Sequence, residues 1–109
     1  MKLRVRSAAH LDIMVLAEFY EQERSGLGHD FLREVDAIFS LFRRQPYLGQ
    51  RIDGHPELRG FQLKRFPYRV IYHLANNEVT ILAVAHQRRR PESWQDRVQE
   101  APAIYQLAA

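Results

Sequence analysis

Arg69 and His86 are the two residues whose types and spacing best fit a chemical site. Asn76 and Asn77 form a favourable two-residue hairpin turn between apolar segments, because asparagine tolerates positive φ. With this turn, Arg69 lies opposite Val84, and Arg69 and His86 fall on the same face of the hairpin. The spacing therefore predicts that the guanidinium and the imidazole are near neighbours at one end of the sheet.

More basic side chains are expected at the same end. Lys64 and Arg65 end the preceding predicted strand, and the Arg88–Arg90 run follows the last one. Arginine binds phosphate through paired hydrogen bonds, and histidine transfers protons near neutral pH. Together these groups suit cleavage of RNA through its own 2′-hydroxyl, which needs no metal. The alternative is that Arg69 is a solvated strand residue and that His86 simply ends its strand.

Other kinds of site find little support in the sequence. The chain has no cysteine, which excludes disulfides, thiolate metal sites and a cysteine nucleophile. Its five histidines show no metal-ligand spacing, and its glycines form no phosphate loop. We therefore expect neither a metal nor a small-molecule cofactor. Four aromatic residues are candidates for stacking on nucleic-acid bases, namely Tyr20, Tyr47, Tyr68 and Trp94.

Length and charge restrict the class of protein. The chain has 109 residues and a net charge of +3, which fits one domain. Acidic residues gather in 8–38 and basic residues in 58–109, so the two parts of the chain differ in charge. This polarity indicates a basic working surface for nucleic acid or an acidic protein segment, and an ordinary arginine-rich surface is the alternative. No apolar run suits a bilayer and no signal peptide begins the chain, so we expect a cytoplasmic protein without membrane contact.

Hydrophobic periodicity predicts an α+β order of elements. We expect a strand at 2–6, helices at 8–24 and from 29 or 30 to about 44, strands at 58–65, 68–74 and 78–85, and a short helix at 91–98. Residues 45–57 contain two prolines and two glycines and are predicted to form a loop. The domain is expected to span 1–98, with 99–109 as a fraying tail.

Apolar residues recur at helical spacing in both predicted helices. In the first helix they are Leu11, Val15 and Phe19, with Ile13, Leu16 and Tyr20 widening the stripe, and in the second they are Phe31, Val35, Ile38 or Phe39, and Phe42. We expect both stripes to lie in the core. Ser7 is a suitable N-cap for the first helix, and Pro46 is expected to end the second because proline disfavours helix in the residue before it.

Two strings in the second half of the chain are specific enough to indicate a family. Residues 63–72 read Leu-Lys-Arg-Phe-Pro-Tyr-Arg-Val-Ile-Tyr, and residues 81–89 read Ile-Leu-Ala-Val-Ala-His-Gln-Arg-Arg, with Pro-Glu-Ser-Trp at 91–94. With them, residues 6–94 resemble the RelE/ParE superfamily of bacterial type II toxin–antitoxin toxins. The resemblance implies two N-terminal helices, an αα-hairpin, packed on a small, mostly antiparallel four-stranded sheet.

The resemblance also implies growth arrest and a cognate antitoxin as partner. RelE-like members cut mRNA on the ribosome with basic residues of the central strands. The leading hypothesis is therefore a metal-independent mRNA endoribonuclease that acts on the ribosome. Its catalytic residues would be Arg69 and His86, and its substrate-binding residues Lys64, Arg65, Arg88 and Arg89.

Two alternatives stay open within the same superfamily. ParE-like members poison DNA gyrase without cutting RNA, so gyrase would replace the ribosome and mRNA as the partner. A third hypothesis is a member without catalysis that only binds its antitoxin or RNA. Trp94 stands near the place of the nucleases' catalytic tyrosine, and its side chain has no ionisable hydroxyl.

Overall fold

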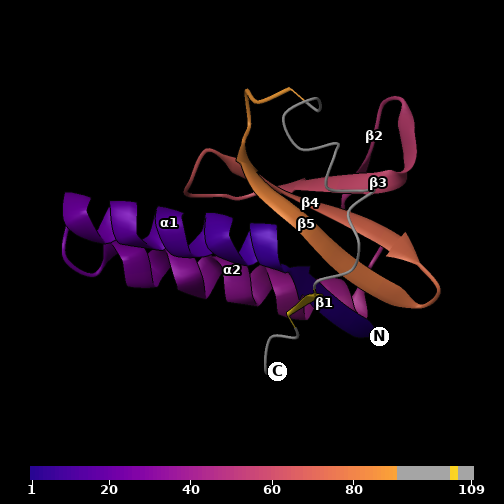
Figure 1. Ribbon diagram of the computed structural model, residues 1–109, viewed down its shortest axis with the longest axis horizontal. Helices are drawn as coiled ribbons and strands as arrows, with labels where there is room; N and C mark the ends of the chain where they lie inside the picture. Colours follow the sequence, from indigo (N-terminus) through magenta and orange to yellow (C-terminus); the bar gives the residue numbers. More distant parts are fainter. Residues whose placement is uncertain (91–103, 106–109) are drawn as a thin grey trace.

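Two antiparallel helices cover one face of a mixed sheet in the computed structural model (Figure 1). The elements are β1 (Lys2–Arg6), α1 (Ser7–Glu23), α2 (Leu27–Arg44), β2 (Gln50–Ile52), β3 (His55–Gln62), β4 (Tyr68–Ala75), β5 (Glu78–His86) and β6 (Ile104–Tyr105). The structure describes residues 1–90 and 104–105. The predicted helix at 91–98, with Trp94, and the predicted domain end at 98 lie outside the described residues, as does most of the predicted tail.

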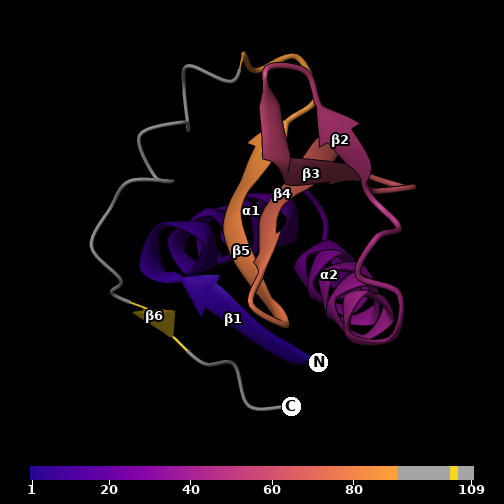
Figure 2. The same cartoon turned by 90° about the vertical axis from the view of Figure 1, so that its right-hand side faces the viewer.

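The sheet has the strand order β2-β3-β4-β5-β1-β6. β1 runs parallel to β5, and every other neighbouring pair is antiparallel. The predicted α+β class, with two N-terminal helices on a mostly antiparallel sheet, is confirmed. β2 and β6 add to the four predicted strands. Figure 2 shows β2 and β3 turning away from the helices at the far end of the sheet.

β2 lies in the segment that was predicted to be a loop. Asp53 and Gly54 connect it to β3, with Ile52 paired to His55, and Gly54 has a φ of 81°. Glycine adopts this backbone conformation without steric cost, so the chain can reverse within two residues. β3 consequently starts three residues earlier than predicted, at His55, and it ends at Gln62.

The turn between β4 and β5 forms as the sequence predicts. Asn76 and Asn77 have φ values of 55° and 58°, and Ala75 pairs with Glu78. Asparagine tolerates this left-handed backbone conformation better than most residues do. The turn fixes the pairing of the two strands as far as Tyr72 and Ile81.

The prediction for the apolar stripe of α2 is confirmed, whereas that for α1 is wrong in its main row. Phe31, Val35 and Phe42 are buried in the core beneath α2. On α1 the predicted Ile13 is buried, together with Ala9 and Ala17, while the main row is exposed, with Leu11 at 63%, Val15 at 57% and Phe19 at 51%. Small side chains at positions 9 and 17 let the helix approach its neighbours closely, and that face turns inward.

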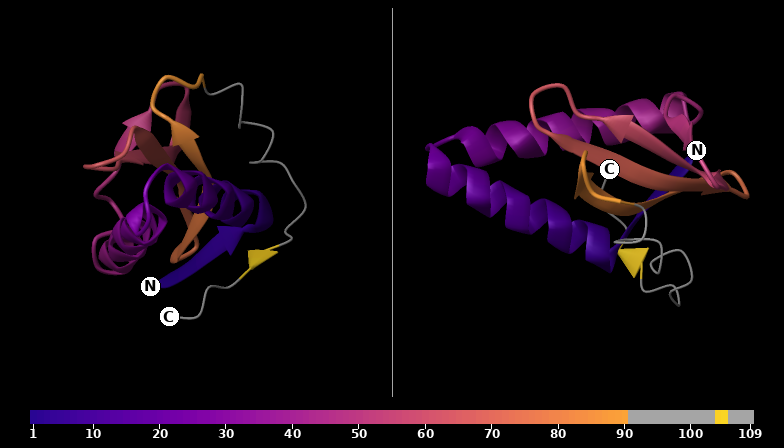
Figure 3. Two further views of the ribbon diagram at one scale, coloured as in Figure 1. Left: turned by 90° about the vertical axis from the view of Figure 1, so that its left-hand side faces the viewer. Right: turned by 90° about the horizontal axis from the view of Figure 1, so that it is seen from above.

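α1 and α2 run side by side as a helical hairpin (Figure 3). Contacts of Glu21 and Gly28 close this hairpin. Glu21 accepts hydrogen bonds from the backbone N–H groups of Gly26 and Gly28, at 2.9 and 3.1 Å. The carboxylate therefore satisfies donors at the start of α2. A β-carbon on Gly28 would lie only 2.3 Å from the carbonyl oxygen of Ala17, so a glycine is required where the helices meet.

Helix boundaries shift slightly from their predicted positions. Ser7 is the first residue of α1 rather than its N-cap, because Arg6 holds that position without a side-chain cap. α2 starts at Leu27 and ends at Arg44, next to Gln45 and Pro46. Among the described residues, no helix is long and apolar enough to cross a membrane.

Candidate functional site

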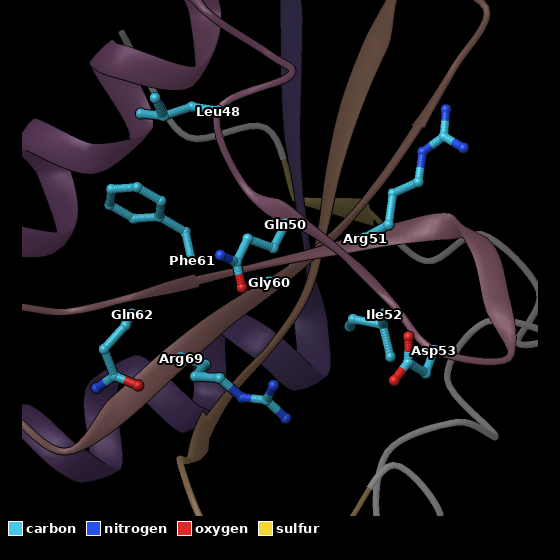
Figure 4. A pocket seen from close by; sticks show the side chains of 9 residues that line it. All are labelled: Leu48, Gln50, Arg51, Ile52, Asp53, Gly60, Phe61, Gln62 and Arg69. Carbon is cyan, nitrogen blue, oxygen red and sulfur yellow. The ribbon is translucent and has the colours of Figure 1, made fainter.

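Arg69 projects from β4 into an open cavity on the face of the sheet that the helices leave uncovered (Figure 4). We call it the outer cavity. Its volume is about 790 Å³, and it is lined by Leu48, Gln50, Arg51, Ile52, Asp53, Gly60, Phe61, Gln62 and Arg69. Arg69 is partly buried, and its Nε is buried without a hydrogen-bond partner among the described residues. The end of its guanidinium lines the cavity, where Nη1 lies beside Gly60.

A β-bulge at Leu82 shifts the pairing of β4 with β5 and so changes the faces on which Arg69 and His86 lie. Ile71 pairs with Ala83 but the next residue, Tyr72, pairs with Ile81, so Leu82 is an extra residue on β5. Beyond the bulge the register shifts by one: Arg69 pairs with Ala85 instead of Val84, and Tyr68 pairs with His86.

The prediction that Arg69 and His86 share a face is therefore wrong. Directly paired residues point to the same face, and successive residues alternate. Val84 belongs to the core under the helices, whereas Ala83 and Ala85 belong to a smaller apolar cluster on the outer face. His86 thus lies on the helix side, and Arg69 lies on the outer side.

His86 lies beside α1, in a second cavity of about 350 Å³. The lining residues are Leu11, Asp12, Val15, Leu16, Tyr68, Val84, His86 and Arg89. The imidazole packs edge-on against the ring of Tyr68, with 5.6 Å between centroids, and its Nδ1 accepts a hydrogen bond from the backbone N–H of Arg88. One ring nitrogen is therefore engaged in holding the turn that ends β5.

Tyr20, whose ring contacts Tyr68, is a poor proton donor. Burial raises the pKa of Tyr20 far above its ordinary value, and a hydrogen bond with Tyr68 raises it further. The ring of Tyr20 packs against Phe31 and Phe66 in an aromatic cluster. We conclude that Tyr20 has a packing role on this side of the sheet.

Lys64 and Arg65 occupy a third position, in the turn between β3 and β4. The backbone N–H of Lys64 donates to the carboxylate of Glu34, and Arg65 forms an exposed ion pair with Asp30 at 3.4 Å. Both acids come from α2. The turn does lie at the same end of the sheet as His86, as predicted, but the Lys64 backbone and the Arg65 guanidinium contact acidic residues of α2, and neither residue lines the outer cavity.

The structure therefore distributes the six predicted site residues over three places. Arg69 lines the outer cavity, Lys64 and Arg65 lie against α2, and His86 and Arg89 line the cavity beside α1, with Arg88 exposed in the same turn. Sequence reasoning did not select Arg51 and Gly60 of the outer cavity. The only available signal for Gly60 was a glycine within an apolar strand pattern, which often marks close approach by a ligand.

The described residues hold no group of three or more histidine, cysteine, aspartate or glutamate side chains that could bind a metal ion. The titratable group nearest the outer cavity with a displaced pKa is Tyr72. Burial raises the pKa of Tyr72, and its hydrogen bond with the backbone of Gly49 opposes part of this effect. The hydroxyl therefore stays protonated and structural at neutral pH.

Comparison with known proteins agrees with this architecture. A chain from a structure described as the chromosomal ParDE TA system from P. aeruginosa has the same fold, with a TM-score of 0.60 and 19% sequence identity over 79% of this chain and 95% of that chain. No curated protein matches the sequence. Residues 3–91, most of the chain, match the family described as "ParE toxin of type II toxin-antitoxin system, parDE". The chain therefore belongs to the ParE toxin family of type II toxin–antitoxin systems.

Proposed function

We propose that this toxin acts by binding DNA gyrase and not by cutting mRNA. The observation that carries the proposal is the β-bulge at Leu82, which places Arg69 and His86 on opposite faces of the sheet. A nuclease that uses both residues needs them at one phosphodiester, with the base and the charge-stabilising group within hydrogen-bond reach of the same reacting atoms. Two groups divided by the sheet cannot meet that requirement without a change of register.

The surroundings of His86 also favour a structural role for this residue. Its Nδ1 holds the backbone of Arg88, and its ring packs on Tyr68. A general base needs a free acceptor nitrogen directed at the proton that it removes. A toxin that acts by binding has no such requirement.

A cognate antitoxin is the second partner that we propose, since the similar structure is described as a ParDE system. The exposed apolar side chains of α1 offer it a docking surface, which we call the α1 surface, formed by Leu11, Met14, Val15 and Phe19. Exposed Arg88 and Arg89 lie at the end of β5, and Arg89 shares a cavity with Leu11 and Val15. An antitoxin segment with apolar anchors and acidic residues fits this combination. Both partners would place the action of the toxin in the cytoplasm.

The experiment that tests the proposed function compares two activities of the toxin, one with the purified protein and one in cells. Incubation with gyrase and supercoiled plasmid should trap cleaved DNA. Primer extension on mRNA from cells that express the toxin should show no new 5′ ends. Toxin-dependent cuts in mRNA without any effect on gyrase would contradict the proposal and would favour the endoribonuclease hypothesis.

A further inference from the structure

Hydrogen bonds from side chains of the sheet hold the loop at residues 45–49, between α2 and β2, in place. The buried hydroxyl of Tyr72 donates a hydrogen bond to the carbonyl oxygen of Pro46 at 2.7 Å and accepts one from the backbone N–H of Gly49 at 2.8 Å. Arg59 adds two hydrogen bonds, from Nη1 to the carbonyl oxygens of Tyr47 and Gly49, at 3.1 and 2.7 Å. Both ends of the loop are therefore fixed to the sheet.

This rigid loop displays two large apolar side chains to solvent. Tyr47 is 69% exposed and Leu48 is 38% exposed. The guanidinium of Arg59 lies over the ring of Tyr47, 5.0 Å from its centroid, so the ring is supported on one face. An aromatic side chain whose backbone is already ordered loses little conformational entropy on binding, which is a property of interface hot spots.

The outer cavity adjoins this loop, because Leu48 is part of its wall. Gly60 forms part of the cavity floor. A β-carbon at this position would lie 3.5 Å from Cδ1 of Ile71 and 3.8 Å from Nη1 of Arg69. One methyl group therefore fits there in ordinary contact, whereas a longer side chain would extend into the cavity. The glycine leaves room for a side chain of another molecule beside the Arg69 guanidinium.

The charges of the outer cavity fit a single carboxylate better than a nucleic-acid strand. Arg69 is the cation that points into it, and it is not ion-paired with a described residue. Arg51 also borders the cavity, but it pairs with Arg59 and its side chain points away from Arg69 (Figure 4). Nucleic-acid affinity comes mainly from several phosphate contacts at once, which one net charge does not supply. A guanidinium binds one carboxylate through two parallel hydrogen bonds, and apolar walls strengthen that interaction.

We propose that the toxin binds its target protein with the outer cavity, chiefly with Leu48, Gly60 and Arg69, and that Tyr47 borders this surface at the edge of the sheet. The part of the target that it fits is an acidic side chain flanked by apolar residues, with the carboxylate on Arg69 and the apolar neighbours on Leu48. The inference rests on the proposed function, in which the target is DNA gyrase. It places the target on the outer face of the sheet, away from the α1 surface.

The test measures binding of the 109-residue toxin to immobilised gyrase by biolayer interferometry. Arg69→Gln removes the charge-assisted hydrogen bonds, and Gly60→Leu fills the cavity floor. Each should weaken binding about tenfold or more. The matched controls are Gly60→Ala, whose methyl group fits, and Arg33→Gln, which removes an exposed charge on α2. Both controls should stay within about twofold of the wild type.

Three further measurements accompany this test: circular dichroism, antitoxin binding and RNA binding of each variant. The first two verify that the fold is intact. If Gly60→Leu does not fold, Arg69→Gln alone tests the inference. Unchanged gyrase binding by folded Arg69→Gln overturns the inference while leaving the proposed function in place. If Arg69→Gln binds a single-stranded RNA oligonucleotide more weakly than the wild type does, with gyrase binding unchanged, the inference is also overturned and the cavity is assigned to nucleic acid. A wild-type toxin that binds no gyrase overturns both proposals.

Discussion

The two faces of the sheet expose different kinds of surface. On the outer face, an open cavity holds Arg69, which has no ion-pair partner among the described residues, beside Leu48 of the clamped 45–49 loop. On the helix side, α1 exposes a row of apolar side chains, and His86 is held among backbone and ring contacts. The outer face offers specific polar recognition, and the helix side offers apolar area.

This difference suggests that each of the two surfaces binds a different partner. A target that must be recognised specifically fits the outer face, and an antitoxin that must bind tightly fits the α1 surface. If the two surfaces are independent, toxicity and neutralisation should be separable by mutation. The following predictions test this separation, beginning with the largest expected effect.

The largest effect is expected on the α1 surface. The double variant Val15→Glu, Phe19→Glu should weaken antitoxin binding by about 100-fold or more, because burial of each apolar side chain contributes about 1.5–3 kcal/mol. Gyrase binding should be retained. Isothermal titration calorimetry with the cognate antitoxin measures the effect, and Glu18→Gln, at an exposed position of the same helix, is the matched control. Equal antitoxin affinity of the double variant and the wild type would disprove docking on α1.

The exposed face of α1 shows where sequence patterns were insufficient. Two rows of apolar residues run along this helix, one through Ile13 and one through Leu11 and Val15. Periodicity selects the row with the larger side chains. Packing selects the row with alanines, because α1 must approach α2 and the sheet closely at Ala9 and Ala17. The sequence pattern located the helix but not the face that it buries.

The register of β4 and β5 was also predictable only in part. The Asn76–Asn77 turn determines the pairing near the turn, and this part was predictable from asparagine's tolerance of positive φ. The bulge at Leu82 was not predictable, because residues 79–85 are almost entirely apolar. They are buried equally well in the register with the bulge and in the register without it. One extra residue then moved His86 to the other face. The Asp53–Gly54 turn of β2, by contrast, follows a recognised hairpin signal and could have been predicted.

The second largest effect is expected at Tyr72, whose hydroxyl holds the 45–49 loop. Tyr72→Phe removes the partner of the Gly49 N–H and the Pro46 carbonyl, so the free energy of unfolding should fall by about 1–3 kcal/mol. Urea unfolding measures this change, with Tyr47→Phe as an exposed control. Gyrase binding should weaken with the loosened loop, while antitoxin binding stays unchanged. A variant as stable as the wild type would show that the clamp contributes nothing.

The same residue gives this prediction a pH dependence. Burial raises the pKa of Tyr72, so folding favours its neutral form. Below about pH 10, the pKa of an unfolded tyrosine, both states are protonated and the contribution is complete. As the pH rises from there through the pKa of the folded protein, the unfolded state loses its proton first and stability falls. The stability difference between the wild type and Tyr72→Phe should therefore shrink above pH 10.

A smaller effect is expected at the basic turn after β5. Arg88→Glu combined with Arg89→Glu should slow antitoxin association about tenfold at low salt, because charge attraction accelerates encounter more than it stabilises the complex. Stopped-flow kinetics across a range of ionic strength measures the on-rate. The wild-type rate should fall with salt, and the variant should lose most of that dependence. An on-rate insensitive to both salt and charge reversal would exclude this turn from antitoxin recruitment.

The smallest effect is expected for His86→Gln, and it separates the two faces most directly. The glutamine side-chain oxygen can accept the hydrogen bond from the Arg88 N–H that Nδ1 accepts now, but glutamine cannot transfer a proton. A toxin that binds gyrase through the outer face should therefore retain growth arrest within about twofold, whereas loss of a general acid or base would reduce activity about 10²–10⁴-fold. Colony counts after induction, gyrase cleavage and primer extension should be measured together, beside Arg69→Gln on the opposite face. Loss of toxicity in folded His86→Gln with Arg69→Gln still active would reverse the assignment and place the working surface on the helix side.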